Sequence, residues 1–180
     1  TVFTSTQIRA LTPEQVALLS TNQIEGMQRG QFSSLTSEQL AALTTGQIAA
    51  IEVFDISGLS STQINALSTE QVQALRTQQV AALSQVQLAA LSEEQVVSLT
   101  TAQIQAITPQ TIPALTTRQT AALSTEQVSK LTTAQITGGA GTDTVSLFEN
   151  LTGGDGNDVL IGTIGANTID GGDGDDTISG

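Results

Sequence analysis

The chain has 180 residues, of which 38% are hydrophobic and only 2% aromatic, so any core must be built from Leu, Ile, Val and Ala. The absence of Cys and His excludes disulfides and thiolate chemistry, and it removes the commonest zinc ligands and the usual general base. The net charge of −12 disfavours nucleic acid and anionic membranes and favours cations. No apolar run approaches the roughly 18 residues of a membrane-spanning helix. We therefore expect no enzyme, no nucleic-acid binding and no membrane insertion.

Residues 3–137 repeat with a period of eight. Large apolar residues occupy the first position of seventeen consecutive octads, from Phe3 to Leu131, without an insertion. The consensus is L-[ST]-x-x-Q-[IV]-x-A, with Gln at the fifth position of fifteen octads and Ser or Thr at the second position of fourteen. A fixed short period of this kind predicts a repeat architecture in which each unit packs on its neighbours.

The second and fifth positions of the octad form a capping-box pattern. The Ser or Thr hydroxyl accepts from the backbone N–H three residues later, and the Gln side chain reaches back to the backbone of the cap. Pro13 and Pro109 follow Thr12 and Thr108, and proline is favoured at the first position of a helix. Each octad is therefore predicted to start a helix. A ligand-binding ladder of Gln amides is the alternative to this structural role.

Neither one long helix nor a set of strands fits the octad. Eight residues advance a helix by about 800°, so successive Leu residues would drift by about 80° and form no apolar stripe. The apolar first, sixth and eighth positions mix odd and even parity, which excludes a strand. We predict a mainly α solenoid of short capped helices with these positions inward. We prefer two octads per coil, and three per coil remains open.

Two octads depart from the consensus in ways that affect the prediction. Residues 51–58 lack both halves of the capping box, because Glu52 and Asp55 replace the Ser or Thr and the Gln, so we expect an irregular turn or bend. Pro113 lies inside its octad and would break a longer helix, which again favours short helices.

The composition changes abruptly at Gly138. Residues 138–180 contain eight acidic residues and no Lys or Arg. We therefore predict two domains, an α-solenoid over residues 1–137 and a separate unit over residues 138–180. A disordered Gly/Asp linker is the less favoured alternative for the second unit.

The second unit contains nine-residue repeats. The segment GGAGTDTVS is followed by LFENLT, and then by GGDGNDVLI, GTIGANTID and GGDGDDTIS without a gap from Gly153. Gly allows positive φ and leaves carbonyl oxygens facing a cavity, and Ca²⁺ takes six to eight oxygen ligands from carbonyls and carboxylates. Val159, Ile169 and Ile178 are expected to pack inward from short strands.

These nonapeptides resemble the RTX consensus G-G-x-G-x-D-x-U-x, whose Asp binds Ca²⁺ between stacked turns. The resemblance implies a short, partial parallel β-roll with two nonapeptides per coil. Asp158 and Asp176 are separated by two nonapeptides, so they would stack and form the best ligand pair. The other ligands that the resemblance implies are carbonyls of both turns: Gly153, Asp155 and Asn157, with Gly171, Asp173 and Asp175.

Two parts of the nonapeptide region depart from the family pattern. Asp143 matches the Asp position, but the LFENLT insertion breaks its register with the later copies, so it is a weaker candidate ligand. Thr163 and Asn167 replace a Gly and the Asp of their copy, so the opposite face of the roll is expected to bind calcium weakly or not at all.

These features predict an extracellular structural or adhesive repeat protein, such as a spacer, a surface-layer protein or a filament subunit, whose RTX repeats fold with calcium. The resemblance implies type I secretion, and hence a secreted or cell-surface location in a Gram-negative bacterium. The alternatives are a binding module for protein or polysaccharide, and a non-catalytic fragment of a larger secreted RTX toxin or enzyme. The expected partners are calcium, a second copy associated end to end, and a cell-surface or matrix component.

Overall fold

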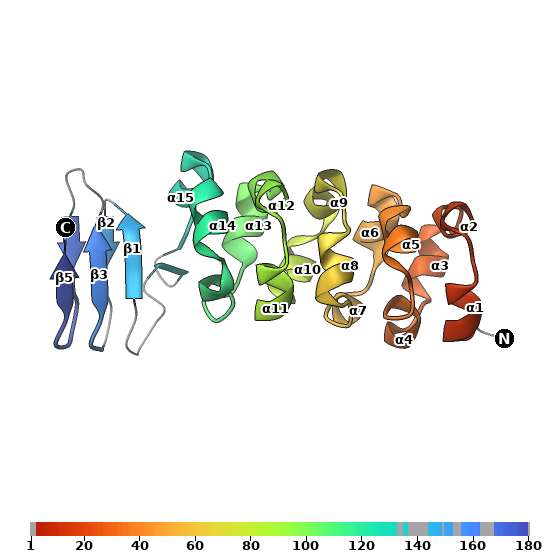
Figure 1. Cartoon of the computed structure of the whole chain (residues 1–180), viewed down its shortest axis with the longest axis horizontal. Helices are drawn as coiled ribbons and strands as arrows, with labels where there is room; N and C mark the ends of the chain where they lie inside the picture. Colours follow the sequence, from red (N-terminus) through yellow and green to blue (C-terminus); the bar gives the residue numbers. More distant parts are fainter. Residues whose placement is uncertain are drawn as a thin grey trace.

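The molecule is a narrow rod of short helices stacked along one axis, with strands at one end (Figure 1). The computed structural model describes residues 3–132, 135–136, 144–148, 150–152, 156–162 and 168–179. The N-terminus lies at the helical end of the rod, and the C-terminus lies among the strands.

Fifteen α-helices and one 3-10 helix make up the helical part of the described chain. The first eight are α1 (Ser5–Arg9), α2 (Pro13–Ala17), α3 (Thr21–Glu25), α4 (Arg29–Phe32), α5 (Ser37–Ala41), α6 (Thr45–Ala50), α7 (Val53–Ile56) and α8 (Ser61–Asn65). They are followed by α9 (Thr69–Ala74), α10 (Thr77–Ala81), α11 (Gln85–Ala89), α12 (Glu93–Ser98), α13 (Thr101–Ala106), the 3-10 helix η1 (Ile112–Ala114), α14 (Thr117–Ala122) and α15 (Thr125–Ser129). The predicted helix per octad is thus confirmed, apart from the octad of η1.

The capping box sets the start of almost every helix. In α5, the Thr36 hydroxyl accepts from the backbone N–H of Gln39 at 3.2 Å, and Gln39 Oε1 accepts from the backbone N–H of Thr36 at 2.8 Å. Pro13 is the first residue of α2, as predicted from the sequence. Helices of four to six residues are far too short to be stable alone in water, so their stability must come from stacking.

Three octads make one coil of the solenoid, and the preferred prediction of two was wrong. Each helix contacts the helix three octads further along the chain, as in the pairs α2 with α5, α3 with α6 and α9 with α12. Each octad contributes two large buried side chains, and three octads enclose six such side chains around one axis. The eight-residue period is compatible with either coil, which is why the period alone does not select between them.

The core follows the first and sixth positions of the octads. Leu67 and Leu75 are 4% exposed, and Ile64 and Val72 are 0–1% exposed. The eighth-position Ala residues are mostly half-buried, so they line the core without filling it. The fifth-position Gln is also buried, which the apolar pattern did not predict.

The buried Gln side chains connect each coil to the preceding one. We call the fifth-position Gln residues from Gln31 to Gln135 the glutamine ladder; its members are 0–8% exposed. In each, Nε2 donates to the carbonyl 28 residues earlier at 2.6–2.9 Å, at the C-terminal end of a helix in the coil below. Most also donate to the carbonyl 31 residues earlier, as Gln79 does to Ile48 at 3.0 Å. One side chain thus satisfies both a helix start and a helix end.

The octad of residues 51–58 forms the short helix α7, so the predicted irregular turn was wrong. Glu52 makes no side-chain cap hydrogen bond, and the helix stays in its column of the solenoid. Arg29 covers this octad from the coil below: its guanidinium lies 5.0 Å from the centre of the Phe54 ring and donates to the Ser57 carbonyl at 3.3 Å. A Cβ on Gly58 would overlap Arg29, so this glycine makes room for the contact.

Asp55 interrupts the glutamine ladder, and we expect Asp55→Gln to stabilise the protein. Asp55 is 6% exposed, and burial, followed by the charge of Glu52, raises its pKa against the opposing effect of Arg29. Because the pKa is higher in the folded chain, the stability that Asp55 contributes is present in acid and is lost as the pH rises through the folded-state pKa. A Gln would instead donate to the carbonyls of Met27 and Ile24.

The measurement is urea unfolding of both chains at neutral pH and at roughly pH 3. The Asp55→Gln variant should be more stable by about 1 kcal/mol at neutral pH, and its advantage should shrink in acid. An equal difference at both pH values would show that ionisation of Asp55 does not matter.

The octad containing Pro113 replaces its α-helix with a turn and the 3-10 helix η1. Pro109 was predicted to begin a helix, but residues 109–111 form a turn, and Thr111 stands where other octads have Gln. The Thr111 hydroxyl accepts or donates locally with Thr108 at 3.0 Å and does not reach the coil below. Pro113 cannot donate a backbone hydrogen bond, which disfavours a longer helix.

Five strands follow the helices: β1 (Thr144–Phe148), β2 (Asn150–Thr152), β3 (Val159–Gly162), β4 (Thr168–Asp170) and β5 (Thr177–Ser179). All pairings are parallel, in one sheet of order β1-β3-β5 and a second of β2-β4. The register of Leu160 with Ile178 and of Leu151 with Ile169 confirms two nonapeptides per coil. Thr144 pairs with Val159, which is a shorter separation, because the LFENLT insertion changes the register.

The first and last elements delimit the predicted domain boundary. Helical residues extend to Ile136 and strands begin at Thr144, so the boundary at residue 138 lies outside the described residues. Among the residues that the structure describes, none belongs to a helix long and apolar enough to cross a bilayer.

Candidate calcium site

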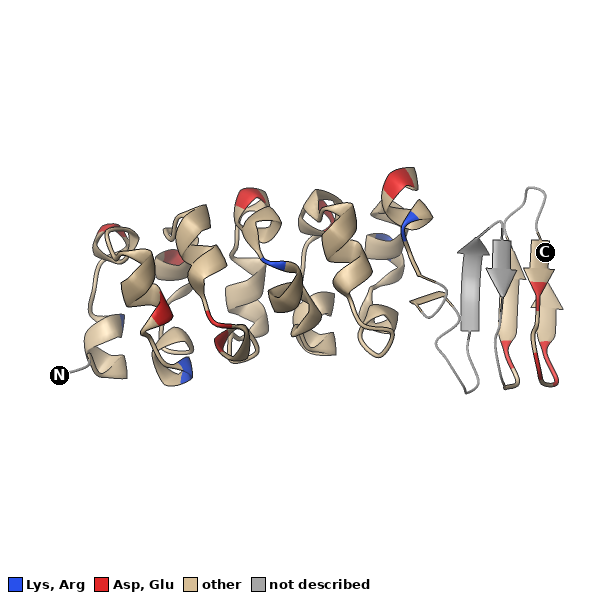
Figure 2. Cartoon of the chain, turned by 180° about the vertical axis from the view of Figure 1, so that it is seen from behind, with Lys and Arg blue, Asp and Glu red and all other residues tan. Residues whose placement is uncertain are grey.

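The candidate site lies in the glycine turns before β3 and β5. Gly156, Gly172 and Gly174 have φ values of 125°, 84° and 144°, which L side chains rarely adopt. Figure 2 shows acidic residues gathered at the turns at one end of these strands, whereas on the helices they are dispersed. The turns therefore place backbone carbonyls and carboxylates on the same side of the roll.

Asp158 and Asp176 are brought together, as their spacing of two nonapeptides predicted. The backbone N–H of Asp158 donates to Asp176 Oδ1 at 2.9 Å, and the backbone N–H of Thr177 donates to the Asp158 carbonyl at 2.7 Å. Asp158 is only 1% exposed, so its carboxylate is held inside the turn. A buried carboxylate is stable in a protein only with hydrogen bonds or a cation beside it.

The glycines leave space for these contacts. A Cβ on Gly171 would lie 2.8 Å from Asp176 Cγ and would overlap the carboxylate itself. A Cβ on Gly174 would overlap the Gly156 carbonyl, which belongs to the turn one coil below. The Asp176 carboxylate therefore lies in a cradle that any larger residue at position 171 would fill.

The other predicted ligands are placed by bonds between the two turns. The carbonyl of Asp173 accepts from the backbone N–H of Gly156 at 2.6 Å, and Asn157 Oδ1 accepts from the backbone N–H of Asp175 at 3.0 Å. Asp173 and Asp175 are exposed, and Gly171 is half-buried. The predicted ligands Asp143, Gly153 and Asp155 lie outside the described residues, as do Thr163 and Asn167.

The groups present suit a hard cation more than a transition metal. The two turns offer carboxylate, amide and carbonyl oxygens, which are the ligands that Ca²⁺ takes, and the chain has no Cys or His. No group of three or more acidic side chains gathers as a metal cluster among the described residues. Backbone carbonyls would therefore have to supply much of the coordination, and Asp158 with Asp176 remain our predicted carboxylate ligands.

Two features of the site were missed or misassigned from the sequence. The inward residue of the first turn is Leu160, which is 0% exposed, whereas Val159 is half-buried, so the choice of Val159 was wrong. Leu160 occupies the eighth position of its nonapeptide, as Ile169 and Ile178 do, and this alignment would have identified it. Ile178 is 51% exposed because β5 is an edge strand, and Asp170 Oδ1, which we had not considered, accepts from Gly172 N–H at 3.2 Å.

Comparison with known families agrees with this geometry. Residues 152–180 match the model of the RTX calcium-binding nonapeptide repeat (4 copies), and residues 48–85 match the model of the ALTTAQ repeat. No curated protein matches the chain. The matched RTX segment contains both Asp158 and Asp176, and the matched ALTTAQ segment lies within the octads of the solenoid. The chain is therefore a calcium-binding repeat protein with RTX nonapeptides in its C-terminal part, preceded by ALTTAQ repeats.

Proposed function

We propose that this chain is a non-catalytic extracellular structural segment, such as a spacer or a surface-layer or filament component, whose C-terminal repeats fold when they bind calcium outside the cell. RTX repeats are typical of secreted proteins. A Gram-negative cell surface, reached by type I secretion, is the location that this class of repeat favours.

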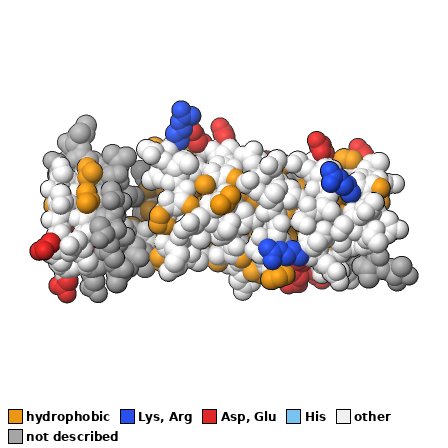
Figure 3. All heavy atoms as spheres, turned by 60° about the horizontal axis from the view of Figure 1, so that its bottom comes forward, with side chains coloured by type: hydrophobic (Ala, Val, Ile, Leu, Met, Phe, Trp, Pro, Cys, Tyr) orange, Lys and Arg blue, Asp and Glu red, His pale blue; other side chains and the backbone are white. Residues whose placement is uncertain are grey.

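The glutamine ladder is the observation that carries the structural role. Its amides are buried and donate to backbone carbonyls of the preceding coil, so they hold the rod together instead of facing a ligand. Figure 3 shows hydrophobic side chains on that face of the helical part only as small separate spots. A surface of this kind suits a spacer more than a docking platform.

The charge distribution supports calcium-dependent folding. All eight charged residues after position 137 are acidic, so in the absence of a cation they repel one another. A cation that binds the folded turns and not the unfolded chain stabilises the fold by mass action. Low calcium inside the cell would keep the repeats unfolded for export, and higher calcium outside would fold them.

A calcium titration of the whole chain, followed by far-UV circular dichroism, tests this proposal. The helical signal of the solenoid should be present without calcium, and a strand signal should appear only as calcium is added. Magnesium at the same concentration is the control, because it prefers six ligands in a tight octahedron and dehydrates reluctantly. A strand signal that is already complete in a chelator would contradict calcium-dependent folding.

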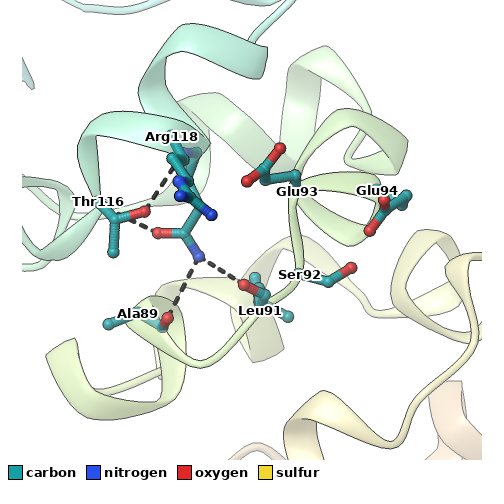
Figure 4. A pocket seen from close by; sticks show the side chains of 8 residues that line it. Ala89, Leu91, Ser92, Glu93, Glu94, Thr116 and Arg118 are labelled. Atoms are coloured by element: carbon teal, nitrogen blue, oxygen red, sulfur yellow. Dashed lines mark hydrogen bonds between the residues drawn. The ribbon is translucent and has the colours of Figure 1, made fainter.

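A binding module for protein or polysaccharide is the second candidate, and one pocket favours it. A shallow pocket of about 340 Å³ lies between α12 and α14 and is lined by Ala89, Leu91, Ser92, Glu93, Glu94, Thr116, Arg118 and Gln119. Figure 4 shows Glu93 and Glu94 on the α12 side and Arg118 on the α14 side. Gln119 at its floor is engaged by the carbonyls of Ala89 and Leu91, at 3.3 and 2.6 Å, so it is not available to a ligand.

A further inference from the structure

The N-terminal end of the solenoid is built differently from its interior. Gln7, Gln15 and Gln23 belong to the fifth-position column, and each Oε1 accepts from the backbone N–H of its helix cap, at 2.9, 2.9 and 2.7 Å. Their Nε2 groups have no acceptor among the described residues, because the equivalent acceptor positions would precede Thr1. All three side chains are exposed, whereas the glutamine ladder is buried.

Apolar side chains accompany these three amides. Phe3 is 54% exposed and Leu18 is 85% exposed, and the first-position residues Leu11 and Leu19 are only partly buried. The same first positions further along the rod, such as Leu43 and Leu67, are 3–4% exposed. The end therefore presents three amide donors, spaced one octad apart, among incompletely covered apolar groups. We call this surface, made of Gln7, Gln15, Gln23, Phe3, Leu11, Leu18 and Leu19, the N-terminal face.

The interior of the rod shows what covers a surface of this kind. Wherever the column is buried, its amides donate to the C-terminal carbonyls of three consecutive octads, as Gln79, Gln87 and Gln95 donate to Ile51, Leu59 and Leu67 at 2.6–2.8 Å. We infer that the N-terminal face is a docking surface for one further coil of three octads, which would present helix C-termini to Gln7, Gln15 and Gln23.

A second copy of this chain is a poorer occupant than a coil of octads. Its complementary surface would be the other end of the solenoid. There the residues at the positions that would donate to the carbonyls of Leu123 and Leu131 are Leu151 and Val159, and neither has a side-chain amide. The strands follow the solenoid along the rod at that end (Figure 1). Docking of a second copy there would have to displace its own strands.

The experiment fuses a copy of residues 75–98, which are three octads, directly before Phe3. This junction keeps the period of eight, and it gives copies of Leu75, Leu83 and Leu91 the acceptor positions for Gln7, Gln15 and Gln23. The fused chain should unfold at a temperature higher by roughly 5 °C or more, because a repeat adds its own interface. The side-chain amides of the three Gln residues should also exchange with solvent at least tenfold more slowly.

The matched control is the triple variant Gln7→Glu, Gln15→Glu and Gln23→Glu, made in both the parent and the fused chain. Glu keeps the oxygen that accepts from the cap and removes the Nε2 donor, so the parent should hardly change while the fused chain loses most of its gain. Equal losses in both chains, or unchanged amide exchange in the fusion, would overturn the inference. So would concentration-dependent association of the parent that the triple variant abolishes, because the occupant would then be a second copy.

Discussion

Gln79→Glu is expected to destabilise the solenoid by roughly 3 kcal/mol or more at neutral pH. Gln79 is 0% exposed, and its Nε2 donates to the carbonyls of Ile48 and Ile51 at 3.0 and 2.7 Å. The substitution keeps the oxygen that accepts from Arg76 N–H at 2.6 Å but turns a negative charge toward two carbonyl oxygens. Urea unfolding monitored by the helical circular dichroism signal measures the loss.

Gln15→Glu is the control, because it makes the same chemical change outside the glutamine ladder. Gln15 is exposed and bonds only within its own capping box, so its replacement should alter stability by less than about 0.5 kcal/mol. The loss caused by Gln79→Glu should diminish in acid, since a protonated carboxyl can donate to the Ile51 carbonyl. Equal effects at positions 15 and 79 would mean that the bonds between coils contribute little.

Gly174→Ala is expected to prevent the strands from forming even at saturating calcium. Gly174 has a φ of 144°, and a Cβ there would overlap the Gly156 carbonyl. Both atoms belong to backbone that carries the coil-to-coil bonds, so no side-chain movement relieves the contact. The calcium-induced strand signal should therefore be lost, while the helical signal and its unfolding midpoint remain.

Gly171→Ala and Gly46→Ala separate a damaged site from a damaged fold. At Gly171 a Cβ would displace the Asp176 carboxylate, so calcium should bind at least tenfold more weakly while the strands can still form at high calcium. Gly46 lies in α6 with its nearest neighbour 4.0 Å from an added Cβ, so Gly46→Ala should stabilise the helix by about 0.5–1 kcal/mol. A normal calcium affinity in Gly171→Ala would remove Asp176 from the predicted ligands.

The sequence predicted the helices well because the capping box is a local signal. Thr36 and Gln39 are three residues apart, and their reciprocal bonds need nothing beyond their own octad. The same Gln39 also donates to Leu11, 28 residues earlier at 2.6 Å, and this second role depends on how coils stack. An eight-residue pattern carries no statement about which octads meet, so the buried ladder could not be derived from the consensus.

A signal for the coil size was nevertheless present in the departures from the consensus. Gln28, Glu52 and Arg76 replace the second-position Ser or Thr, and they recur at every third octad, which is one coil. In the structure they belong to α4, α7 and α10, which stack in one column. Arg76 Nη2 donates to the Ile51 carbonyl at 2.9 Å across this column. Exceptions to a repeat can therefore report the coil size that the repeat itself conceals.

The candidate site was predictable to the level of its register. The spacing of two nonapeptides placed Asp158 against Asp176, because parallel strands of equal length align equivalent residues. The direction of each carbonyl was not predictable, since Asp173 and Asn157 turn out to bond to the neighbouring turn. Such choices depend on the φ values of Gly156 and Gly174, which the residue type permits but does not fix.

The coil of three octads has a consequence for how such a protein can change in length. Every Gln of the ladder bonds to an octad a fixed number of units earlier, so deleting or duplicating a single octad leaves each remaining bond with an equivalent acceptor. Each such event would nevertheless rotate everything downstream by one third of a turn about the rod. Single-unit changes would therefore redirect the calcium-binding end around the axis, whereas changes of three units would alter only its reach.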